Sequence, residues 1–240
     1  LVPSGGVAIE ILMRILKESN KNVFCRHIRH TCPAQPFSIL RSGVIPLPCN
    51  QGINPFVLPN YVYNNSSKEN LVLPTHYWGY PEKLNNFLKE YTIEDCCLSF
   101  DSYQPNGDHV GTQGIAGIFS FGYLKPIQAG EGGLICTNNT SLANEIRTMQ
   151  NYGINDSKDV KSFGINGRIS CIQAAIISEQ LKTYKKYTVV EIFSRHGLNS
   201  SIATSPRVLR SPYMLKPTGM EHIGIPKSCY YGNPPTLLAS

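Results

Sequence analysis

A single lysine stands in a stretch that is otherwise poor in charge. Lys125 follows the apolar run IAGIFSF and precedes the turn GEGG, after which a second apolar run, LIC, begins. An amine among apolar neighbours loses hydration, which favours its neutral, nucleophilic form. The position therefore indicates a lysine that forms a Schiff base and transfers protons, rather than a surface cation.

Two further features match the same chemistry. Asp95 ends a short apolar segment, where a buried carboxylate needs a cationic partner, and a protonated ring nitrogen is one candidate. Ser4, Gly5 and Gly6 precede a run with helical apolar spacing, and the free amide groups of such a first turn suit a phosphate. A reactive amine, an acid for a pyridinium and a phosphate site are together what pyridoxal phosphate requires, so we predict this cofactor.

The segments that carry these residues alternate between predicted helices and strands. Helical spacing covers residues 6–17, 36–43, 81–91, 141–153 and 172–193. Short apolar runs at 22–25, 44–49, 92–100, 115–121 and 132–138 indicate strands, and residues 70–79 indicate a strand and its turn. Residues 50–70, rich in Asn, Pro and Ser, are expected to form a surface loop. This alternation is typical of an α/β protein with a largely parallel sheet. Because the periodicity fades after residue 197, we predict a large cofactor-binding domain over residues 1–197 and a short or rudimentary C-terminal segment over 198–240.

The bulk composition narrows the class of protein. Apolar residues make up 41% of the 240 residues and charged residues 16%, which favours a folded core over disorder. The net charge of +6 is scattered without a basic block, so it favours an anionic small ligand over nucleic acid. No apolar run approaches the roughly 20 residues of a membrane span. The opening residues do not read as a signal peptide, and the eight cysteines form no C-x-x-C pair, so we expect a reducing, cytoplasmic setting.

Three segments resemble the signature segments of the pyridoxal-phosphate-dependent nucleotide-sugar aminotransferases, the DegT/DnrJ/StrS group. They read IEDCC, GIFSFGYLKPIQAGEGGLICTNN and GINGRISCIQAAI, in the order and at the intervals of that family. The most specific part is S-F-x-x-x-K followed by G-E-G-G. The resemblance implies an α/β, aspartate-aminotransferase-like fold (fold type I), in which a mixed, mostly parallel sheet lies between helices, here followed by a short C-terminal remnant.

The resemblance also implies roles for single residues. Lys125 would hold the cofactor as a Schiff base and, once released, move the proton between the substrate carbon and the cofactor. Asp95 would pair with the pyridine nitrogen, so that the ring can take up an electron pair. Gly5, Gly6 and Ser120 would bind the phosphate. No metal is expected at this site.

The implied reaction and assembly follow from the same resemblance. An amino acid, usually glutamate, would give its amino group to the cofactor, which would then aminate a keto sugar attached to a nucleoside diphosphate. Asn166 would reach into the partner subunit's site, because members of the family build paired active sites across a homodimer interface. The expected partners are therefore a nucleotide sugar, an amino-acid donor and a second copy of the chain, without nucleic acid.

Several positions depart from the family pattern. Gly6 stands where the family usually has Thr, Leu98 where Gln or His contacts the phenolic oxygen of the cofactor, and Cys32 where an aromatic residue stacks on the ring. His30 is the nearest substitute for that aromatic residue. The chain is also shorter than family members, and we interpret it as truncated or diverged at both ends. One alternative is therefore a diverged pyridoxal-phosphate-binding protein of the same fold that lacks transaminase activity.

A second alternative belongs to a different class. Cys25, His27, His30 and Cys32 lie within eight residues and are the ligand types that zinc prefers, which would make a zinc-binding interaction module. The C-x-H and H-x-C pairs are spaced too closely for the usual zinc knuckle.

Overall fold

The computed structural model describes residues 1–18, 23–49, 58–77, 81–84, 87–123 and 125–184. Its strands are β1 (Phe24–Ile28), β2 (Ile45–Cys49), β3 (Asn70–Leu73), β4 (Ile93–Asp95), β5 (Ala116–Ser120) and β6 (Gly133–Cys136). They form one group in the order β2-β1-β3 and another in the order β4-β5-β6. Parallel bridges from Val72 to Thr92 and from Thr75 to Asp95 join β3 to β4. Within the described residues, the strands therefore follow one continuous order, and β6 alone runs antiparallel to its neighbour.

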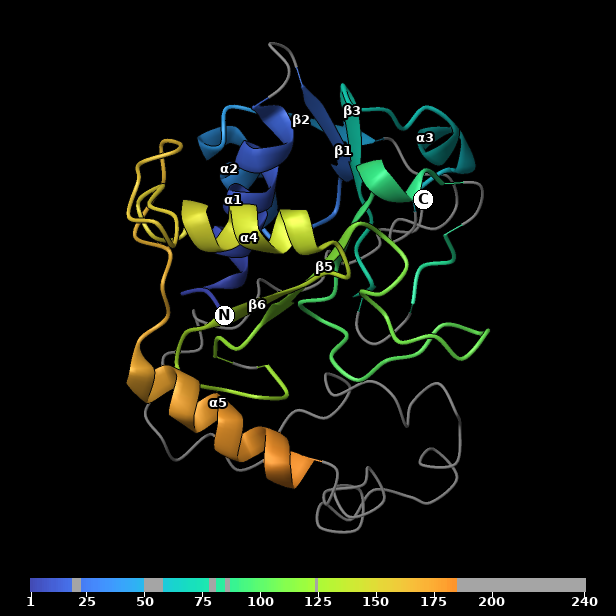
Figure 1. Cartoon of the computed structure of the whole chain (residues 1–240). Helices are drawn as coiled ribbons and strands as arrows, with labels where there is room; N and C mark the ends of the chain where they lie inside the picture. The colour runs from blue at the N-terminus through green and yellow to red at the C-terminus, as the bar shows by residue number, and fades with distance from the viewer. Residues whose placement is uncertain (19–22, 50–57, 78–80, 85–86, 124, 185–240) are drawn as a thin grey trace, which may run out of the picture.

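The helices are α1 (Gly5–Lys17), α2 (Ala34–Arg41), α3 (Asn60–Asn64), the 3-10 helix η2 (Lys89–Tyr91), α4 (Thr140–Met149) and α5 (Cys171–Tyr184). Helix α1 lies between α2 and α4 beside the strands (Figure 1). Its apolar side chains, among them Ala8, Ile11 and Leu12, are buried in a core that also takes side chains from β1, β3, β4 and β5. Burial of this helix face is the main reason that α1 is held against the sheet.

The start of α1 is fixed by a serine N-cap. The hydroxyl oxygen of Ser4 accepts a hydrogen bond from the amide of Val7 at 3.2 Å, which is the usual geometry of a serine N-cap. The helix begins one residue earlier than predicted, at Gly5. Helix α4 is capped instead by Asn139, whose side chain accepts from the amide of Leu142 at 3.1 Å, and not by the serine at its start.

The predicted helix at residues 81–91 is wrong over the residues that the structure describes. Residues 81–84 and 87–88 have no regular structure, and only the short η2 follows them. The apolar spacing has another cause: Leu84 and Phe87 pack against a small core around Val62 and Tyr63, whereas Tyr91 packs against the main core. When apolar side chains of an irregular segment pack into two different cores, their spacing can resemble the apolar periodicity of a single helix.

Helix α3 lies where a surface loop was predicted. Asn60–Asn64 is short and has little intrinsic helix propensity, but Val62 and Tyr63 are fully buried in the smaller core. Burial of these two side chains outweighs the weak propensity, and nothing in the local pattern signals it.

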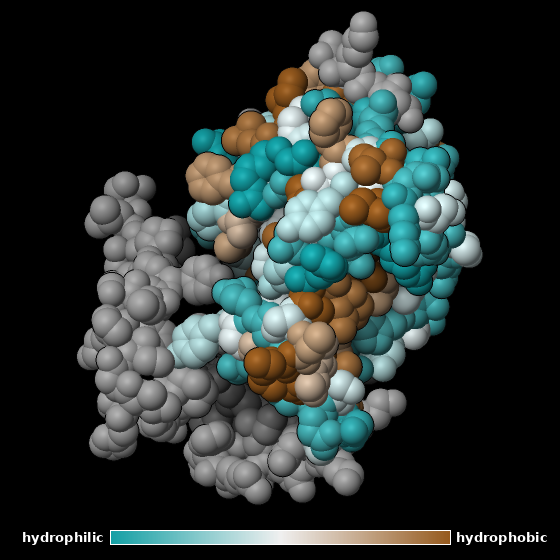
Figure 2. Space-filling model, turned by 60° about the vertical axis from the view of Figure 1, so that its left-hand side comes forward, coloured by the Kyte–Doolittle hydropathy of each residue, from teal (hydrophilic) through white to brown (hydrophobic). Residues whose placement is uncertain are grey.

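Helix α5 lies beside the turn between β5 and β6 (Figure 1), and among its described residues only Ile177 is buried, in a small cluster with Phe121 and Ile127. Ile172, Ile176 and Leu181 are 75%, 41% and 44% exposed. Apolar side chains are also exposed in groups on the face shown in Figure 2. The rest of the predicted 172–193 helix, the predicted boundary at residue 197 and the C-terminal segment lie outside the described residues. No helix among the described residues is long and apolar enough to cross a membrane.

Candidate active site

The first turn of α1 lies against the C-terminal ends of β4 and β5. A methyl group added at Gly5 would lie 2.9 Å from Sγ of Cys97 and 3.2 Å from Cβ of Ser120. A methyl group at Gly6 would lie 3.0 Å from Oγ of Ser38. The absence of side chains at these two positions thus lets the helix start approach the sheet and three polar side chains closely.

This arrangement offers hydrogen-bond donors that fit a phosphate. The amides of Gly5 and Gly6 donate no hydrogen bond to any described residue, because the first turn of a helix has no preceding carbonyls to accept them. The oxygen of the Ser120 hydroxyl accepts from the amide of Gly122 at 3.4 Å, which leaves its proton available. Together with the positive end of the α1 dipole, these groups form an anion site of the right chemistry.

Asp95 is buried at the end of β4 and is held from two sides. Its Oδ1 accepts the amide of Cys97 at 3.0 Å, and its Oδ2 accepts a hydrogen bond from Nε2 of Gln35 at 2.7 Å. Gln35, also buried, donates a second hydrogen bond to Oγ1 of Thr75 at 2.9 Å. The Cys97 thiol also forms a hydrogen bond with Asp95. All these donors are neutral, so the carboxylate can still pair with a protonated ring nitrogen.

Lys125 lies in the turn between β5 and β6, partly buried, and its amide donates to the carbonyl of Gly122 at 3.2 Å. The pKa of the neighbouring Cys97 thiol depends on the charges around it. Burial, and then Asp95, raise the pKa of the Cys97 thiol well above its usual range, while the Lys125 ammonium acts in the opposite direction. The acid, the amine and the thiol therefore share one neighbourhood beside the Gly5 turn.

The departures from the family pattern lie around the same place. Cys32 is exposed in the loop after β1, and His30 is exposed beside it. Burial first, and then Cys32 and Asp95, raise the pKa of Tyr77. The ring of Tyr77 therefore lies near both of these residues. Sequence reasoning singled out neither Tyr77 nor Gln35. Leu98, partly buried, follows Cys97 on the chain.

Asn166 lies apart from this group. It is exposed and forms an isolated antiparallel bridge with Asn151. The structure thus brings Gly5, Gly6, Ser120, Asp95 and Lys125 together, and it leaves Asn166 on the surface.

Behind Asp95, a second carboxylate is fully buried. Glu94 accepts hydrogen bonds from the amides of Gly111, Gln113 and Gly114 at 2.9, 2.7 and 2.7 Å, and from Nε2 of His76 at 2.9 Å. Burial alone would raise the pKa of Glu94, but His76 and the backbone amides outweigh it and lower that pKa. Glu94 thereby fixes the loop before β5 to the strand that carries Asp95.

The imidazole of His76 links this carboxylate to the backbone of Glu82, whose side chain is a third buried carboxylate. Nδ1 of His76 accepts the amide of Glu82 at 2.9 Å, so its Nε2 carries the proton that is donated to Glu94. Oε1 of Glu82 accepts the amide of Leu58 at 2.7 Å and the hydroxyl of Tyr63, whereas its Oε2 is buried without a partner among the described residues. Burial raises the pKa of Glu82 to about 7, although these hydrogen bonds oppose the shift.

The predicted alternative of a zinc site at Cys25–Cys32 is not supported by the geometry. Cys25 and His27 are buried on β1, whereas His30 and Cys32 are exposed in the following loop, and no three of these side chains bring ligand atoms within 4.8 Å of one another. Among the described residues, His76, Glu94 and Cys96 do come that close. The hydrogen bonds above occupy His76 and Glu94, and Sγ of Cys96 donates to the carbonyl of Glu94 at 3.7 Å, so this group is a structural network.

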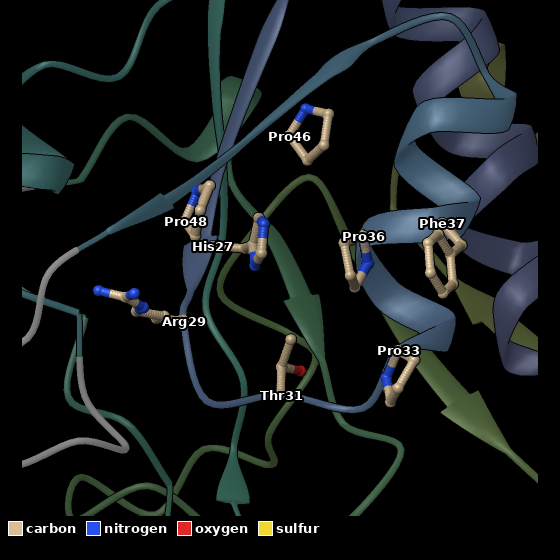
Figure 3. A pocket seen from close by; sticks show the side chains of 8 residues that line it. All are labelled: His27, Arg29, Thr31, Pro33, Pro36, Phe37, Pro46 and Pro48. Atoms are coloured by element: carbon tan, nitrogen blue, oxygen red, sulfur yellow. The ribbon is translucent and has the colours of Figure 1, made fainter.

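A surface cavity of about 390 Å³ lies beside β1, β2 and the start of α2 (Figure 3). It is lined by His27, Arg29, Thr31, Pro33, Pro36, Phe37, Pro46 and Pro48. Nδ1 of His27 donates to the carbonyl of Ile28 at 2.8 Å, and burial lowers the pKa of this imidazole. None of the residues that surround Asp95 and Lys125 lines this cavity, so it is separate from the candidate active site.

Known proteins and a known family resemble this chain. The sequence profile of the DegT/DnrJ/EryC1/StrS aminotransferase family matches residues 2–211. A curated relative, the dTDP-3-amino-3,6-dideoxy-alpha-D-galactopyranose transaminase of Aneurinibacillus thermoaerophilus, is 30% identical over 161 residues, which are 63% of this chain and 44% of the relative. The chain spans less than half the length of the curated relatives that it matches.

Solved structures share the fold. PseC of Helicobacter pylori, an aminotransferase involved in the biosynthesis of pseudoaminic acid, superposes with a TM-score of 0.68 at 22% identity, over 77% of this chain and 53% of PseC. A DegT DnrJ EryC1 StrS aminotransferase from Brucella abortus superposes with a TM-score of 0.71 at 20% identity, over 88% of this chain and 62% of that protein. The profile match over most of the sequence, on a fold that these structures share, shows that the chain belongs to the DegT/DnrJ/EryC1/StrS aminotransferase family.

Proposed function

We propose that this chain is a pyridoxal-phosphate-dependent aminotransferase that moves an amino group from an amino acid, glutamate in the first instance, to a keto sugar linked to a nucleotide. The observation that carries the proposal is the meeting of three groups. The Gly5 turn, the Asp95 carboxylate and Lys125 come from distant parts of the chain to one edge of the sheet. The sugar class rests on family membership and on the relatives named above.

Each group has a chemical task. Pyridoxal phosphate, when bound, supplies an aldehyde that accepts an amine and a ring that takes up an electron pair. The amides of Gly5 and Gly6 and the hydroxyl of Ser120 would bind the phosphate. The Asp95 carboxylate would hold a proton on the ring nitrogen, and the Lys125 amine would anchor the cofactor and move the proton at the reacting carbon of the substrate.

The proposal includes a homodimer and a cytoplasmic location. The exposed apolar side chains of α5, and Phe163 at 95% exposure, are surfaces that a second copy would cover. Asn166 is exposed on the segment that leads into α5, which supports the proposal that it reaches across such an interface. The seven cysteines among the described residues are free thiols, which supports a reducing compartment.

The test compares Lys125→Ala with Lys89→Ala, a control that removes an exposed amine. The wild-type chain and the control should take up pyridoxal phosphate and show the visible band at about 420 nm that the lysine-bound cofactor gives. Lys125→Ala should lack the band, and borohydride should fix the label on Lys125 alone, as read by peptide mass spectrometry. A colourless wild-type chain, or a label elsewhere, would contradict the cofactor assignment.

Glutamate separates the enzyme from a diverged binding protein. In an aminotransferase, glutamate should bleach the band of the wild-type chain, and 2-oxoglutarate should appear in equal amount. A nucleotide-linked keto sugar should then restore the band and yield the amino sugar. A band that persists with glutamate would favour the diverged binding protein and reject transamination.

A further inference from the structure

The side chain of Gln35 is the feature of the candidate active site that has no assigned role. It is 1% exposed, in the first turn of α2, and reaches Asp95 across sixty positions of sequence. Its Nε2 lies 2.7 Å from Oδ2 of Asp95 and 2.9 Å from Oγ1 of Thr75. Both contacts have hydrogen-bond length, and both lie in the interior, where such bonds are strongest.

The chemistry of the pair fixes which way the amide faces. A carboxylate only accepts hydrogen bonds, so the NH2 group of Gln35 must point to Asp95, because the reverse orientation would set two acceptors against each other. Oε1 of Gln35 has no partner among the described residues, so the orientation is determined by the two donated bonds. The amide therefore acts on Asp95 as a fixed donor.

A neutral donor has a specific advantage at this position. A Lys or Arg in place of Gln35 would neutralise Asp95 and compete with a protonated ring nitrogen for its charge. The amide instead orients the carboxylate plane together with the backbone amide of Cys97, which donates to Oδ1. It thus leaves the negative charge of Asp95 for the cofactor.

We infer that Gln35 is a positioning residue for the cofactor: its amide holds the Asp95 carboxylate oriented toward the pyridine nitrogen of pyridoxal phosphate. The inference rests on the proposed function, because it assumes that this cofactor binds here. It adds a residue on α2, a different element from the strand that carries Asp95.

The chain provides a matched control. Gln104 is a second buried glutamine, 4% exposed, and its Nε2 donates to the carbonyl of Glu82 at 3.0 Å. Gln104→Leu removes the same group from the interior as Gln35→Leu, without touching Asp95. Gln35→Glu keeps the shape of the side chain but turns the donor into an acceptor beside a carboxylate.

The readout is cofactor affinity, measured by absorbance titration of the full chain with pyridoxal phosphate and with its 1-deaza analogue, which lacks the ring nitrogen. The wild-type chain should bind pyridoxal phosphate more tightly than the analogue. Gln35→Leu should weaken pyridoxal phosphate binding by about tenfold, the usual effect of losing a hydrogen bond to a charged group, and should bring the two affinities together. Gln35→Glu should weaken binding further, and Gln104→Leu should keep both affinities of the wild type.

Each outcome supports or rejects the positioning role of Gln35. If Gln35→Leu does not fold, Gln35→Glu with the two ligands answers the same question. Equal loss in Gln35→Leu and Gln104→Leu, or a preference for pyridoxal phosphate over the analogue that survives in both Gln35 variants, would overturn the positioning role and leave the proposed function intact. A wild-type chain that binds neither ligand would reject the proposed function, and the inference with it.

Discussion

The buried carboxyl of Glu82 makes a quantitative prediction about stability. Its pKa is about 7 in the folded protein, against 4.5 for an ordinary glutamate, because burial disfavours the charged form. The folded protein therefore binds this proton more tightly than the unfolded chain. Its contribution to the free energy of unfolding is fully present below about pH 4.5 and is lost as the pH rises through about 7.

The size of the pKa shift sets the size of the effect on stability. At about 1.4 kcal/mol per pKa unit, Glu82 contributes about 3 kcal/mol to the free energy of unfolding at low pH, and about 2.5 kcal/mol of this is lost between pH 5 and pH 8. Glu82→Gln imitates the protonated acid: its oxygen can accept from Leu58 and Tyr63, and its NH2 replaces the unpartnered Oε2. The variant should be close to the wild type in stability at pH 5 and more stable than it at pH 8.

The assay is urea unfolding followed by circular dichroism at pH 5 and pH 8, with Glu145→Gln on the exposed face of α4 as the control. Other ionisable groups titrate in every variant, so the difference between Glu82→Gln and the wild type isolates Glu82. A difference that stays constant across this range, or a control that shows the same change, would refute the assignment of a buried acid with a raised pKa.

Three further predictions concern the candidate site. Gly5→Ala should lower the free energy of unfolding by about 1–3 kcal/mol, because its methyl group meets the Cys97 sulfur; adding Cys97→Ala should recover part of this in urea titrations, and strict additivity would count against the contact. Glu94→Gln should cost about 3 kcal/mol or more by the same assay, because an NH2 group would face backbone amides that now donate to a carboxylate. Iodoacetamide at pH 7.5 should label the exposed Cys32 much faster than Cys97, whose pKa is raised, in time-resolved peptide mass spectrometry; equal rates would show that Cys97 is not held in this environment.

The sequence predicts most of the regular elements because their signals are local. The apolar runs around Cys25, Ile118 and Ile135 have the length and flanking turns of strands, and they form β1, β5 and β6. Ser4 signals the start of α1 through its own cap. The predictions for residues 81–91 and for α3 fail because of a second, small core. Its side chains come from segments far apart in the sequence, so no local pattern shows which of them will be buried together.

The residues of the candidate site also differ in whether the sequence reveals them. Lys125, Asp95 and the Gly5 turn can be found from sequence, because an amine among apolar residues, a carboxylate after an apolar run and glycines at a helix start are each visible locally. Ser120 follows only from the family resemblance. Gln35 cannot be found in this way. Its role depends on the place of α2 against the end of β4, which the pairing of β1 with β3 sets. A lone glutamine in an amphipathic helix carries no local signal of that contact.

Strand β2, at one border of the sheet, has a consequence for how the protein can assemble. The amide of Ile45 donates inward to the carbonyl of Val23, so the alternate positions, Pro46 and Pro48, turn their backbone nitrogens outward. Proline has no N–H, and this border therefore offers an approaching strand no donors at those two positions. The protein is thereby protected against edge-to-edge aggregation at β2, and copies of the chain must associate through side chains rather than by extending the sheet there.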